Sequence, residues 1–397
     1  MEPQPQGKAA IYLVLFLMSL SLHIQFPIFT PYAVALGATT FFISVMMSSS
    51  SFTNMSGNIM AGPFIDRIGK KPFIVIPLFL SAFLMIAHAV ADNAQQLFIL
   101  RILNGFVLAF MSPACFALLS AYAKNTRQQG KNMAVNGITI TMAGIAAPFI
   151  GGQLSKILTF SEIYLVIGSA LFCTALLALF YIREAEPIVI VKDKAKPSLA
   201  QMLKSSSLMP IYFIGFALMY GHGTLYYELP FLSVEHGMTT AETGKLFSLM
   251  GLGTFASLSL FWLNRFSSLL RTAIGMFLSA LFYYQLASSV LPIGLGLTLF
   301  GMGISSGLLF PAITTLLTEK VGQDQYGSAF GILSAVFSLG MIVSSLVAGV
   351  VHDMMSPYYL AFLVTMCGTL YVVYDYLQKK RTDGGRRTEA SEKKEAG

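Results

Sequence analysis

The stretch that decides the fold is Gly62-Pro-Phe-Ile-Asp-Arg-Ile-Gly-Lys-Lys71. It lies between two long apolar runs and concentrates charged side chains between glycines. A short charged segment between two such runs is typical of a polar turn that connects two membrane-spanning helices. The sequence on both sides of the stretch must then meet the requirements of a lipid bilayer.

The composition agrees with a membrane protein. Hydrophobic residues make up 55% of the chain and charged residues 11%, with a mean hydropathy of +0.70, which excludes an ordinary soluble globular protein. A bilayer core needs about 20 apolar residues per helix, and every backbone polar group in it must be satisfied within the segment, so the spans are expected to be helices. Twelve segments fit this description: 10–33, 41–61, 72–91, 96–120, 132–154, 162–182, 210–231, 243–262, 272–290, 292–317, 329–351 and 357–378.

The basic residues predict the orientation of the chain. Of 25 Lys and Arg residues, only Arg101, Lys156 and Lys245 fall outside the segments expected on the side that holds both termini. This bias predicts a multi-pass protein of the cell membrane with both termini in the cytoplasm. The net charge of +7 is then explained by topology and by attraction to membrane lipids, and we expect no nucleic-acid partner.

The chain also repeats itself. Gly105, Pro113 and Leu119 recur in the same order and spacing in a later apolar segment that carries Gly303, Pro311 and Leu317. Parallel repeats of this kind, with a binding site between them near the bilayer midplane, are typical of transporters. The predicted domains are an N-terminal six-helix bundle (1–182), a cytoplasmic linker (183–209), a C-terminal six-helix bundle (210–378) and a disordered cytoplasmic tail (379–397).

With membrane helices on both sides, the opening stretch resembles the loop between the second and third helices of the major facilitator superfamily. The matching positions are Gly62, Asp66, Arg67, Gly69, Lys70 and Lys71. The resemblance implies an all-α integral membrane fold of twelve transmembrane helices, arranged as two pseudo-symmetric six-helix bundles that transport by alternating access. It also implies that these six residues act as a conformational latch between the bundles. The alternative is a plain basic loop on the cytoplasmic side.

A second motif narrows the resemblance to the twelve-helix drug:proton antiporters, which are efflux proteins. Pro148, Gly151 and Gly152 match the family's antiporter motif in the fifth helix, although alanines stand at two positions, 143 and 147, where the motif has glycine. The end of the first helix, Pro27 to Tyr32, resembles a further motif of the same group. Physically, the proline frees a backbone carbonyl and the small residues permit close packing against the eighth helix.

Two charged residues within the spans are the candidates for proton coupling. Arg101 must be solvated or paired there, and Arg101-x-x-Asn104-Gly105 resembles the family's fourth-helix motif, with Asn104 in the glutamine position. The family ties this arginine to proton coupling. Glu228 lies at a similar depth, ~11 Å outside the helix midpoint, and both side chains are expected to face one shared cavity. The alternatives are an arginine that reaches the interface and a glutamate that caps a helix end.

The histidines offer further proton carriers. His23 and His222 lie near the midpoints of their helices, and histidine titrates closest to neutral pH, so each is a candidate for proton coupling or cargo binding. A neutral packing histidine is the alternative reading for both. His88 is expected at the interface, near a helix end. No pair of histidines shares a helix face with a carboxylate at metal-ligand spacing, so neither a metal site nor a cofactor is expected.

Other polar residues at membrane depth are candidates for binding cargo. Such groups usually face a cavity or hold helices together, and both readings stay open here. The substrate-binding candidates are Gln25, Tyr226, Tyr227, Tyr220, Asn136 and Asn58.

The sequence therefore predicts a transporter and not an enzyme. It contains no phosphate-binding loop, nucleophile elbow or dinucleotide fingerprint. We expect a monomeric, proton-coupled exporter of a small molecule, either a drug-like compound or a polar metabolite such as a metallophore, and the polar residues near the midplane favour a polar or zwitterionic cargo. The alternatives are a proton-driven nutrient importer and a lipid flippase or non-transporting receptor on the same fold.

Overall fold

The computed structural model describes residues 5–122, 126–184, 205, 207–235, 237–288, 294–321 and 326–374. Most of the predicted linker, and the whole of the predicted tail, lie outside these residues.

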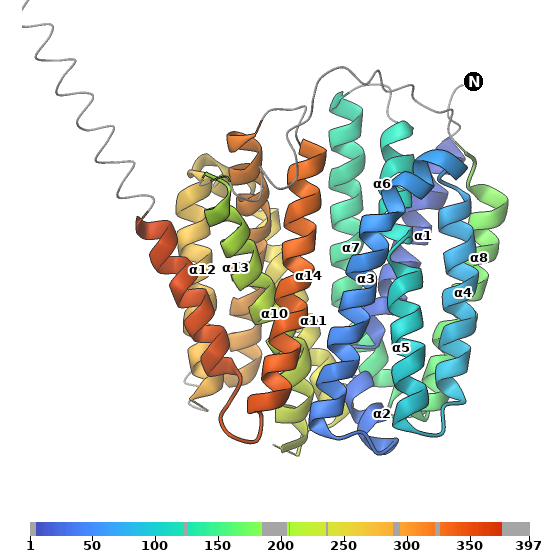
Figure 1. Ribbon diagram of the computed structural model, residues 1–397, viewed down its shortest axis with the longest axis horizontal. Helices are drawn as coiled ribbons and strands as arrows, with labels where there is room; N and C mark the ends of the chain where they lie inside the picture. Colours follow the sequence, from blue (N-terminus) through green and yellow to red (C-terminus); the bar gives the residue numbers. More distant parts are fainter. Residues whose placement is uncertain are drawn as a thin grey trace, which may run out of the picture.

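The described part of the chain is helical, and each of the twelve predicted segments falls on one helix or on a pair of consecutive helices (Figure 1). The first half contains α1 (Pro5–Ile24), α2 (Phe29–Ala35), α3 (Thr40–Ile68), α4 (Pro72–Ala89), α5 (Ala94–Leu108), α6 (Met111–Ala121), α7 (Thr126–Leu154) and α8 (Phe160–Tyr181). The second half contains α10 (Met209–Glu235), α11 (Thr240–Ser259), the short helix η1 (Phe261–Arg265), α12 (Ser268–Ala287), α13 (Gly294–Lys320), α14 (Tyr326–Val351) and the helix Tyr358–Tyr374.

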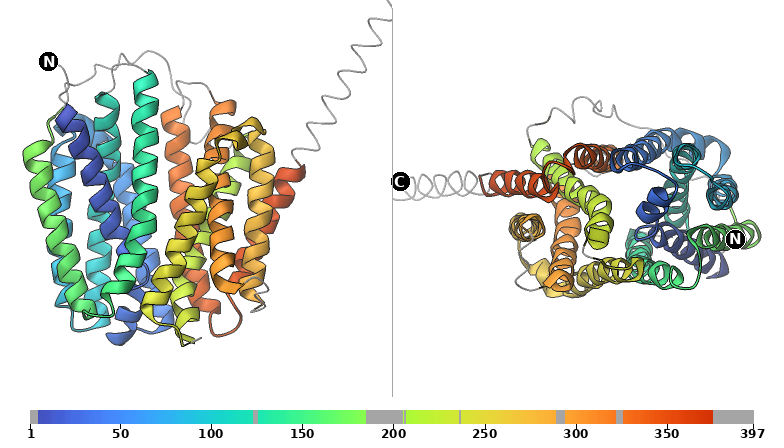
Figure 2. Two further views of the ribbon diagram at one scale, coloured as in Figure 1. Left: turned by 180° about the vertical axis from the view of Figure 1, so that it is seen from behind. Right: turned by 90° about the horizontal axis from the view of Figure 1, so that it is seen from below.

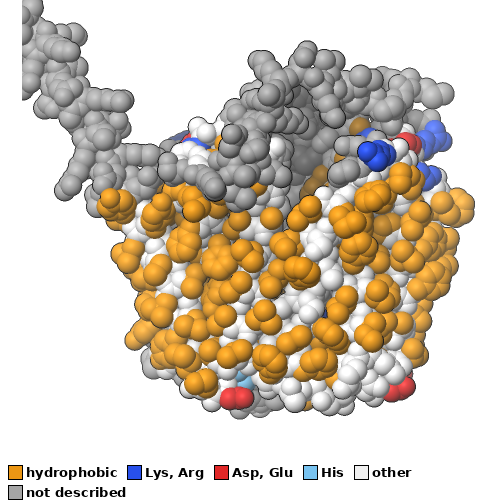
Figure 3. Space-filling view, in the orientation of Figure 1, with side chains coloured by type: hydrophobic (Ala, Val, Ile, Leu, Met, Phe, Trp, Pro, Cys, Tyr) orange, Lys and Arg blue, Asp and Glu red, His pale blue; other side chains and the backbone are white. Residues whose placement is uncertain are grey.

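Seven described spans are long and apolar enough to cross a membrane, with α5 and α6 forming one of them, and the α1–α2 pair, bent by 46°, is an eighth when it is counted as one span. Helices α3, α10 and α11 are not apolar enough to be counted as spans, because polar and charged side chains interrupt them. The helix Tyr358–Tyr374 is apolar but too short to be counted. They run alongside the apolar helices in the same assembly (Figures 1 and 2). On the face in Figure 3, hydrophobic side chains cover the middle of the molecule and basic side chains gather at one edge.

The two halves also share a turn before a long helix. Gly37 and Gly237 both adopt positive φ, 82° and 68°, and each ends the connection that precedes a helix. Two residues later a threonine caps that helix: Thr39 accepts from the Phe42 N–H, and Thr239 accepts from the Glu242 N–H and forms a capping box with Glu242. The same turn chemistry therefore starts the second long helix of each half.

The two halves meet along two seams. Helix α7 packs against α11, and α3 packs against α14. Buried apolar residues form three clusters, one built almost entirely from the first half and two from the second. Seen along the helices, the helices of the two halves are arranged side by side in one ring (Figure 2, right).

The seams are tight at one end of the molecule only. We call the end where α1 begins and Tyr358–Tyr374 ends the terminus end, and the opposite end the far end. Toward the far end, a Cβ on Gly349 of α14 would lie 2.3 Å from the Ser44 Cβ of α3, and a Cβ on Gly152 of α7 would lie 2.9 Å from the Ala241 Cα of α11. Toward the terminus end, a Cβ on Gly331 would meet nothing within 4 Å. The halves are thus closed together at the far end.

Candidate functional site

A cavity of about 260 Å³ lies between the two halves. Its wall comes from α1, α7, α10, α11, α13 and the turn after α1, so both halves contribute. No aspartate, glutamate, lysine or arginine is among the described residues of this wall, which is mainly aromatic and aliphatic. The lining residues are His23, Phe26, Ile140, Thr141, Gly144, Pro148, Met219, His222, Tyr226, Phe247, Met250, Gly251, Thr254, Ser306 and Phe310.

His23 brings a hydrogen-bond acceptor to this wall from the first half. Its Nδ1 lies 2.6 Å from the carbonyl oxygen of Ser19 one turn earlier. A carbonyl oxygen only accepts, so Nδ1 carries a proton and, in the neutral ring, Nε2 is the acceptor. Within the described chain Nε2 has no hydrogen-bond partner, and it lies at the cavity wall near Gly144. His23 can therefore accept a hydrogen bond from a bound molecule.

His222 is its counterpart in the second half. Its Nδ1 lies 2.9 Å from the Leu218 carbonyl oxygen, which again fixes the proton on Nδ1, and its Nε2 lies 3.1 Å from the Ser306 hydroxyl of α13. That hydroxyl also lies 2.9 Å from the Met302 carbonyl oxygen. Ser306 has one proton to donate, so it either donates to His222 or accepts from it. The pair can thus exist with His222 neutral or charged.

Aromatic rings join the halves across the cavity. Phe26, in the turn between α1 and α2, stacks on Tyr226 of α10 with ring centroids 4.5 Å apart and an interplanar angle of 22°. Phe247 of α11 lies within 6.0 Å of both rings. These contacts make an aromatic floor to which a planar molecule can stack.

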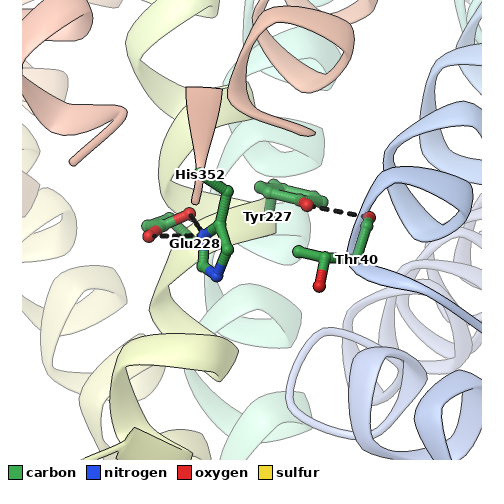
Figure 4. Close-up of polar contacts among 4 residues, drawn as sticks. All are labelled: Thr40, Tyr227, Glu228 and His352. Carbon is green, nitrogen blue, oxygen red and sulfur yellow. Dashed lines mark hydrogen bonds and ion pairs between the residues drawn. The ribbon is translucent and has the colours of Figure 1, made fainter. Parts of the chain in front are cut away.

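Glu228 and His352 form an ion pair outside the cavity wall, toward the far end (Figure 4). The Nδ1 of His352, in the turn after α14, lies 3.1 and 3.0 Å from the two carboxylate oxygens of Glu228 on α10. The side chains are 12% and 8% exposed, so both are largely withdrawn from solvent. A carboxylate and an imidazole in this arrangement can share or exchange a proton.

Tyr227, next to Glu228 on α10, connects this pair to the other half. Its ring lies 6.3 Å from the His352 ring, nearly perpendicular to it, and its hydroxyl donates to the Thr40 carbonyl oxygen at the start of α3 over 2.9 Å (Figure 4). Tyr227 is fully buried and does not line the cavity. Its contact with Thr40 favours a role in holding the halves together, one of the two readings that the sequence left open.

Arg101 lies elsewhere, in the first half. Its guanidinium stands 3.6 Å above the Phe29 ring of α2 and lies 3.5 Å from the Tyr164 hydroxyl of α8. The structure therefore gives Arg101 and Glu228 different partners and does not join them as an ion pair. An arginine over an aromatic face is partly compensated by the ring's quadrupole, which explains how it is accommodated without an acidic partner among its described contacts.

His88 lies in the last turn of α4, near a helix end as expected, and its side chain is buried within the protein. It is 0% exposed, its ring stacks on Tyr164 with centroids 5.2 Å apart, and its Nδ1 faces the Leu84 carbonyl oxygen at 2.7 Å. Tyr32 donates to the His88 carbonyl oxygen. The hydrogen-bonded ring packs as an aromatic core residue.

The remaining cargo candidates do not line the cavity. Gln25, directly after α1, is buried, and its amide donates to the Ser21 carbonyl oxygen one turn earlier. Tyr220 and Asn136 are also buried away from the cavity wall. Asn58 donates to Asn54 on an exposed stretch of α3. Of the six residues predicted to bind cargo, Tyr226 is the one that the structure places on the wall.

The expected latch loop is held by its own half. The backbone N–H groups of Lys70 and Lys71 donate to the two carboxylate oxygens of Glu184, at 3.0 and 2.7 Å, and the Lys71 ammonium donates to the Leu179 carbonyl oxygen. Gly69 has a φ of 112°, which favours glycine. Arg67 ends α3. The side chains of Gly62 and Asp66 lie outside those that the structure describes.

The fifth-helix motif makes close helix contacts, as its small residues suggest. A Cβ on Gly151 would lie 2.6 Å from the Ile24 carbonyl oxygen of α1, and a Cβ on Gly244 of α11 would lie 2.3 Å from the Pro148 carbonyl oxygen of α7. Gly152 approaches Ala241 in the same way. The motif therefore brings α7 against both α1 and α11.

Two functional candidates escaped the sequence reasoning. His352 lies in a turn and Ser306 is one of many serines in apolar helices, and nothing in their local sequence separates them from packing residues. Only the tertiary structure identifies them, because each contacts an ionisable side chain of another helix. His352 contacts Glu228, and Ser306 contacts His222.

Comparisons with known proteins agree with this geometry. A family model described as Major Facilitator Superfamily matches residues 11–345 and 272–394. The chain is 22% identical over 372 residues to the multi-drug resistance efflux pump PmrA of Streptococcus pneumoniae, covering 91% of this chain and 92% of that protein. It is 23% identical to the quinolone resistance protein NorA of Staphylococcus aureus, with coverages of 92% and 95%. A crystal structure of a POT family transporter in complex with a thioalcohol-conjugated peptide superposes with a TM-score of 0.79 at 13% identity, covering 95% of this chain and 96% of that one.

Proposed function

The chain belongs to the major facilitator superfamily of membrane transporters, and from that premise we propose that it is a proton-coupled exporter of small aromatic molecules. One observation carries the proposal: helix α10 bears the cavity residues His222 and Tyr226 and also Glu228, whose carboxylate pairs with His352 in the turn after α14. A cargo site and a proton site on one rigid element can be coupled, because a shift of the helix that follows from occupancy of one site changes the other.

The proton site of this proposal is the Glu228–His352 pair. Glu228 is the buried carboxylate nearest to the cavity-lining part of α10, and His352 supplies a second group that accepts a proton near neutral pH. The cavity has no acidic group of its own on its described wall. Proton binding and cargo binding therefore use separate residues. Each can oppose the other only by changing the conformation of the carrier.

The cargo is an uncharged or weakly basic aromatic compound of modest size. The rings of Phe26, Tyr226 and Phe247 offer stacking surfaces, and the Nε2 atom of His23 offers an acceptor for an N–H or O–H donor. A zwitterion or a carboxylate-rich metallophore would leave its charges uncompensated on this wall, which costs several kcal/mol per ion. The wall thus favours the drug-like cargo over the polar one that the sequence suggested.

The names of two relatives favour export as the direction of transport. PmrA and NorA are named as an efflux pump and a resistance protein, respectively. In this scheme a proton from outside binds while the cargo leaves, and its release inside resets the carrier. One charge that moves through 100 mV supplies about 2.3 kcal/mol, enough to sustain a cargo gradient of about 50-fold.

The test is exchange in proteoliposomes with an imposed pH gradient. The purified full chain is reconstituted, and transport of the aromatic, weakly basic dye Hoechst 33342 is followed by fluorescence, with the pH gradient in each direction. We expect accumulation on the acidic side and a matching proton flux. An importer would instead accumulate the dye on the alkaline side.

The matched variants are Glu228→Gln and Glu319→Gln. Glu319 is a carboxylate of the same half that accepts a hydrogen bond from Ser268 and lies outside the proposed proton site. Glu228→Gln is expected to abolish gradient-driven accumulation while dye-for-dye exchange persists, and Glu319→Gln is expected to behave as the parent. Parent-like proton exchange by Glu228→Gln would overturn the assignment of the proton site.

A further inference from the structure

The far-end seam contains one place where an ionisable pair and a contact between the halves are neighbours. Glu228 and Tyr227 are consecutive on α10, and their side chains diverge: Glu228 binds His352 within its own half, and Tyr227 reaches Thr40 in the other (Figure 4). The His352 ring lies against Tyr227 and against Phe231, with centroids 6.3 and 5.1 Å away. The position of His352 therefore determines the packing of Tyr227.

The contact between Tyr227 and Thr40 is one of few direct hydrogen bonds between the halves in the described chain. The other at this seam runs from the Ser48 hydroxyl of α3 to the Ile342 carbonyl oxygen of α14. Tyr227 is 0% exposed and belongs to the hydrophobic cluster of the first half, although it is part of the second. Moving this side chain would open the far-end seam at its centre.

We propose that a single proton on the Glu228–His352 pair fastens the far end of the transporter, with His352 as the positioning residue and Tyr227 as the link to the other half. The proposal rests on the proton coupling proposed above and specifies how it drives the conformational change. It assigns to His352 a role that neither the sequence motifs nor the cavity indicates.

The chemistry of the Glu228–His352 pair determines whether protonation closes or opens the far end. Without that proton, His352 is neutral and its Nδ1–H donates to the ionised carboxylate of Glu228. With the proton bound, the pair is imidazolium and carboxylate, and the attraction between opposite charges in a poorly hydrated place adds to the hydrogen bond. Protonation from outside therefore strengthens the arrangement in which Tyr227 reaches Thr40, the far end closes, and the carrier turns inward. Loss of the proton to the inside weakens the fastening.

Other titratable groups surround the pair. Tyr227 and Tyr358 lie within electrostatic range of Glu228, and Asp353, adjacent to His352, lies within range of Tyr227. Tyr358 is 1% exposed, and its hydroxyl has no partner in the described part of the chain. Of these side-chain types, histidine is the one that ordinarily changes charge near neutral pH, so the proposal places the proton on His352.

The experiment measures the width of the far end as a function of pH, without any cargo. Spin labels are attached at Val90→Cys and Lys245→Cys, two exposed far-end positions in different halves, in the full chain in lipid nanodiscs after the exposed Cys173 and Cys367 are changed to serine. We measure the fraction of parent molecules with a long distance between the labels, in which the far end is open, and the fraction with a short distance, in which it is closed. We expect the ratio of the first fraction to the second to rise about fivefold between pH about 6 and about 8.

The variants separate a proton effect from a structural one. His352→Gln keeps a donor to Glu228 but takes up no proton, so its open fraction is expected to be independent of pH over this range. Tyr227→Phe keeps the ring against His352 but loses the donor to Thr40, so its open fraction is expected to exceed the parent's at both pH values. A parent-like pH response in His352→Gln, or a parent-like open fraction in Tyr227→Phe, would overturn the proposal.

Failure of the role proposed for His352 can be distinguished from failure of the proposed exporter function. If His352→Gln retains the parent's pH response while Glu228→Gln loses gradient-driven dye accumulation, the proton exporter stands and the fastening role of His352 does not. If the parent exchanges no protons for dye, the exporter fails whatever the label distances show.

Discussion

Tyr226 is the residue at which cargo recognition is most directly testable, because its ring forms one side of the aromatic floor of the cavity. We expect Tyr226→Ala to weaken binding of Hoechst 33342 about threefold to tenfold, since an aromatic contact contributes about 0.5–1.5 kcal/mol. Tyr226→Phe keeps the ring and should bind nearly as the parent does. Fluorescence titration of the detergent-solubilised protein measures both.

The matched control is Tyr284→Ala, which removes an exposed tyrosine from α12, away from the cavity wall. It should leave dye affinity unchanged. Equal losses in Tyr226→Ala and Tyr284→Ala would mean that the aromatic floor does not contact the dye.

Gly151 tests the close packing of the fifth-helix motif. A Cβ there would lie 2.6 Å from the Ile24 carbonyl oxygen, so Gly151→Ala must push α1 and α7 apart. We expect a loss of about 1–3 kcal/mol in stability, seen as a lower unfolding temperature in detergent.

Gly137, on the same helix, provides the comparison. A Cβ there would meet nothing within 4 Å, so Gly137→Ala should be neutral or stabilising by up to about 1 kcal/mol from helix propensity. If the two variants unfold at the same temperature, the close approach at Gly151 has no energetic consequence.

The residues of the site were only partly predictable from the sequence. Glu228, His23 and His222 stand out because ionisable side chains in apolar helices are costly, and that argument needs no partner. Their partners Ser306 and His352, and the separation of Arg101 from Glu228, depend on which helix faces which. The depth of a residue along its helix can be counted from the sequence. The direction in which its side chain points around the helix axis, and the helix that it faces, depend on how the helices pack.

Among the helices, the α3–α14 seam offers the sharpest test of how the halves close. Gly349 lets α14 approach Ser44 so closely that an added Cβ would lie 2.3 Å from the Ser44 Cβ. Gly349→Ala is therefore expected to shift the far end toward the open arrangement, raising the fraction of long distances between the Val90 and Lys245 labels severalfold.

Gly331→Ala makes the same substitution on the same helix toward the terminus end, where the added Cβ meets nothing within 4 Å. It should leave the label distances unchanged. Should Gly349→Ala also leave them unchanged, the closed far end would not depend on close packing of α3 and α14.

Helix boundaries were more predictable than helix pairing. Thr159 and Thr239 each form a capping box with a glutamate three residues on, and such boxes are local signals that the sequence carries by itself. The bend of 46° between α1 and α2 follows the run that ends with Pro27, whose ring cannot continue a regular helix. The polarity of α3, α10 and α11 reflects their place at the seams and the cavity, where protein replaces lipid.

At the scale of the whole molecule, the fold followed from composition and the internal repeat, since a bilayer leaves few ways to satisfy the backbone. The arrangement of the halves did not, because the same chain must close at either end during transport. The structure has its close contacts at the far end, and the Glu184-bound latch loop at the terminus end contacts its own half. The far-end-closed arrangement is one member of the cycle proposed here.

The orientation of the molecule in the cell membrane is the last property to test. The basic residues predict that the terminus end is cytoplasmic. Ile157, in the connection after α7, is 77% exposed at the far end, and Lys131 is exposed near the start of α7 at the terminus end. In intact cells, Ile157→Cys should react with a membrane-impermeant maleimide, and Lys131→Cys should react only after permeabilisation. The reverse pattern would place the termini outside and would overturn the predicted orientation, so that the proton which closes the far end would bind from the cytoplasmic side.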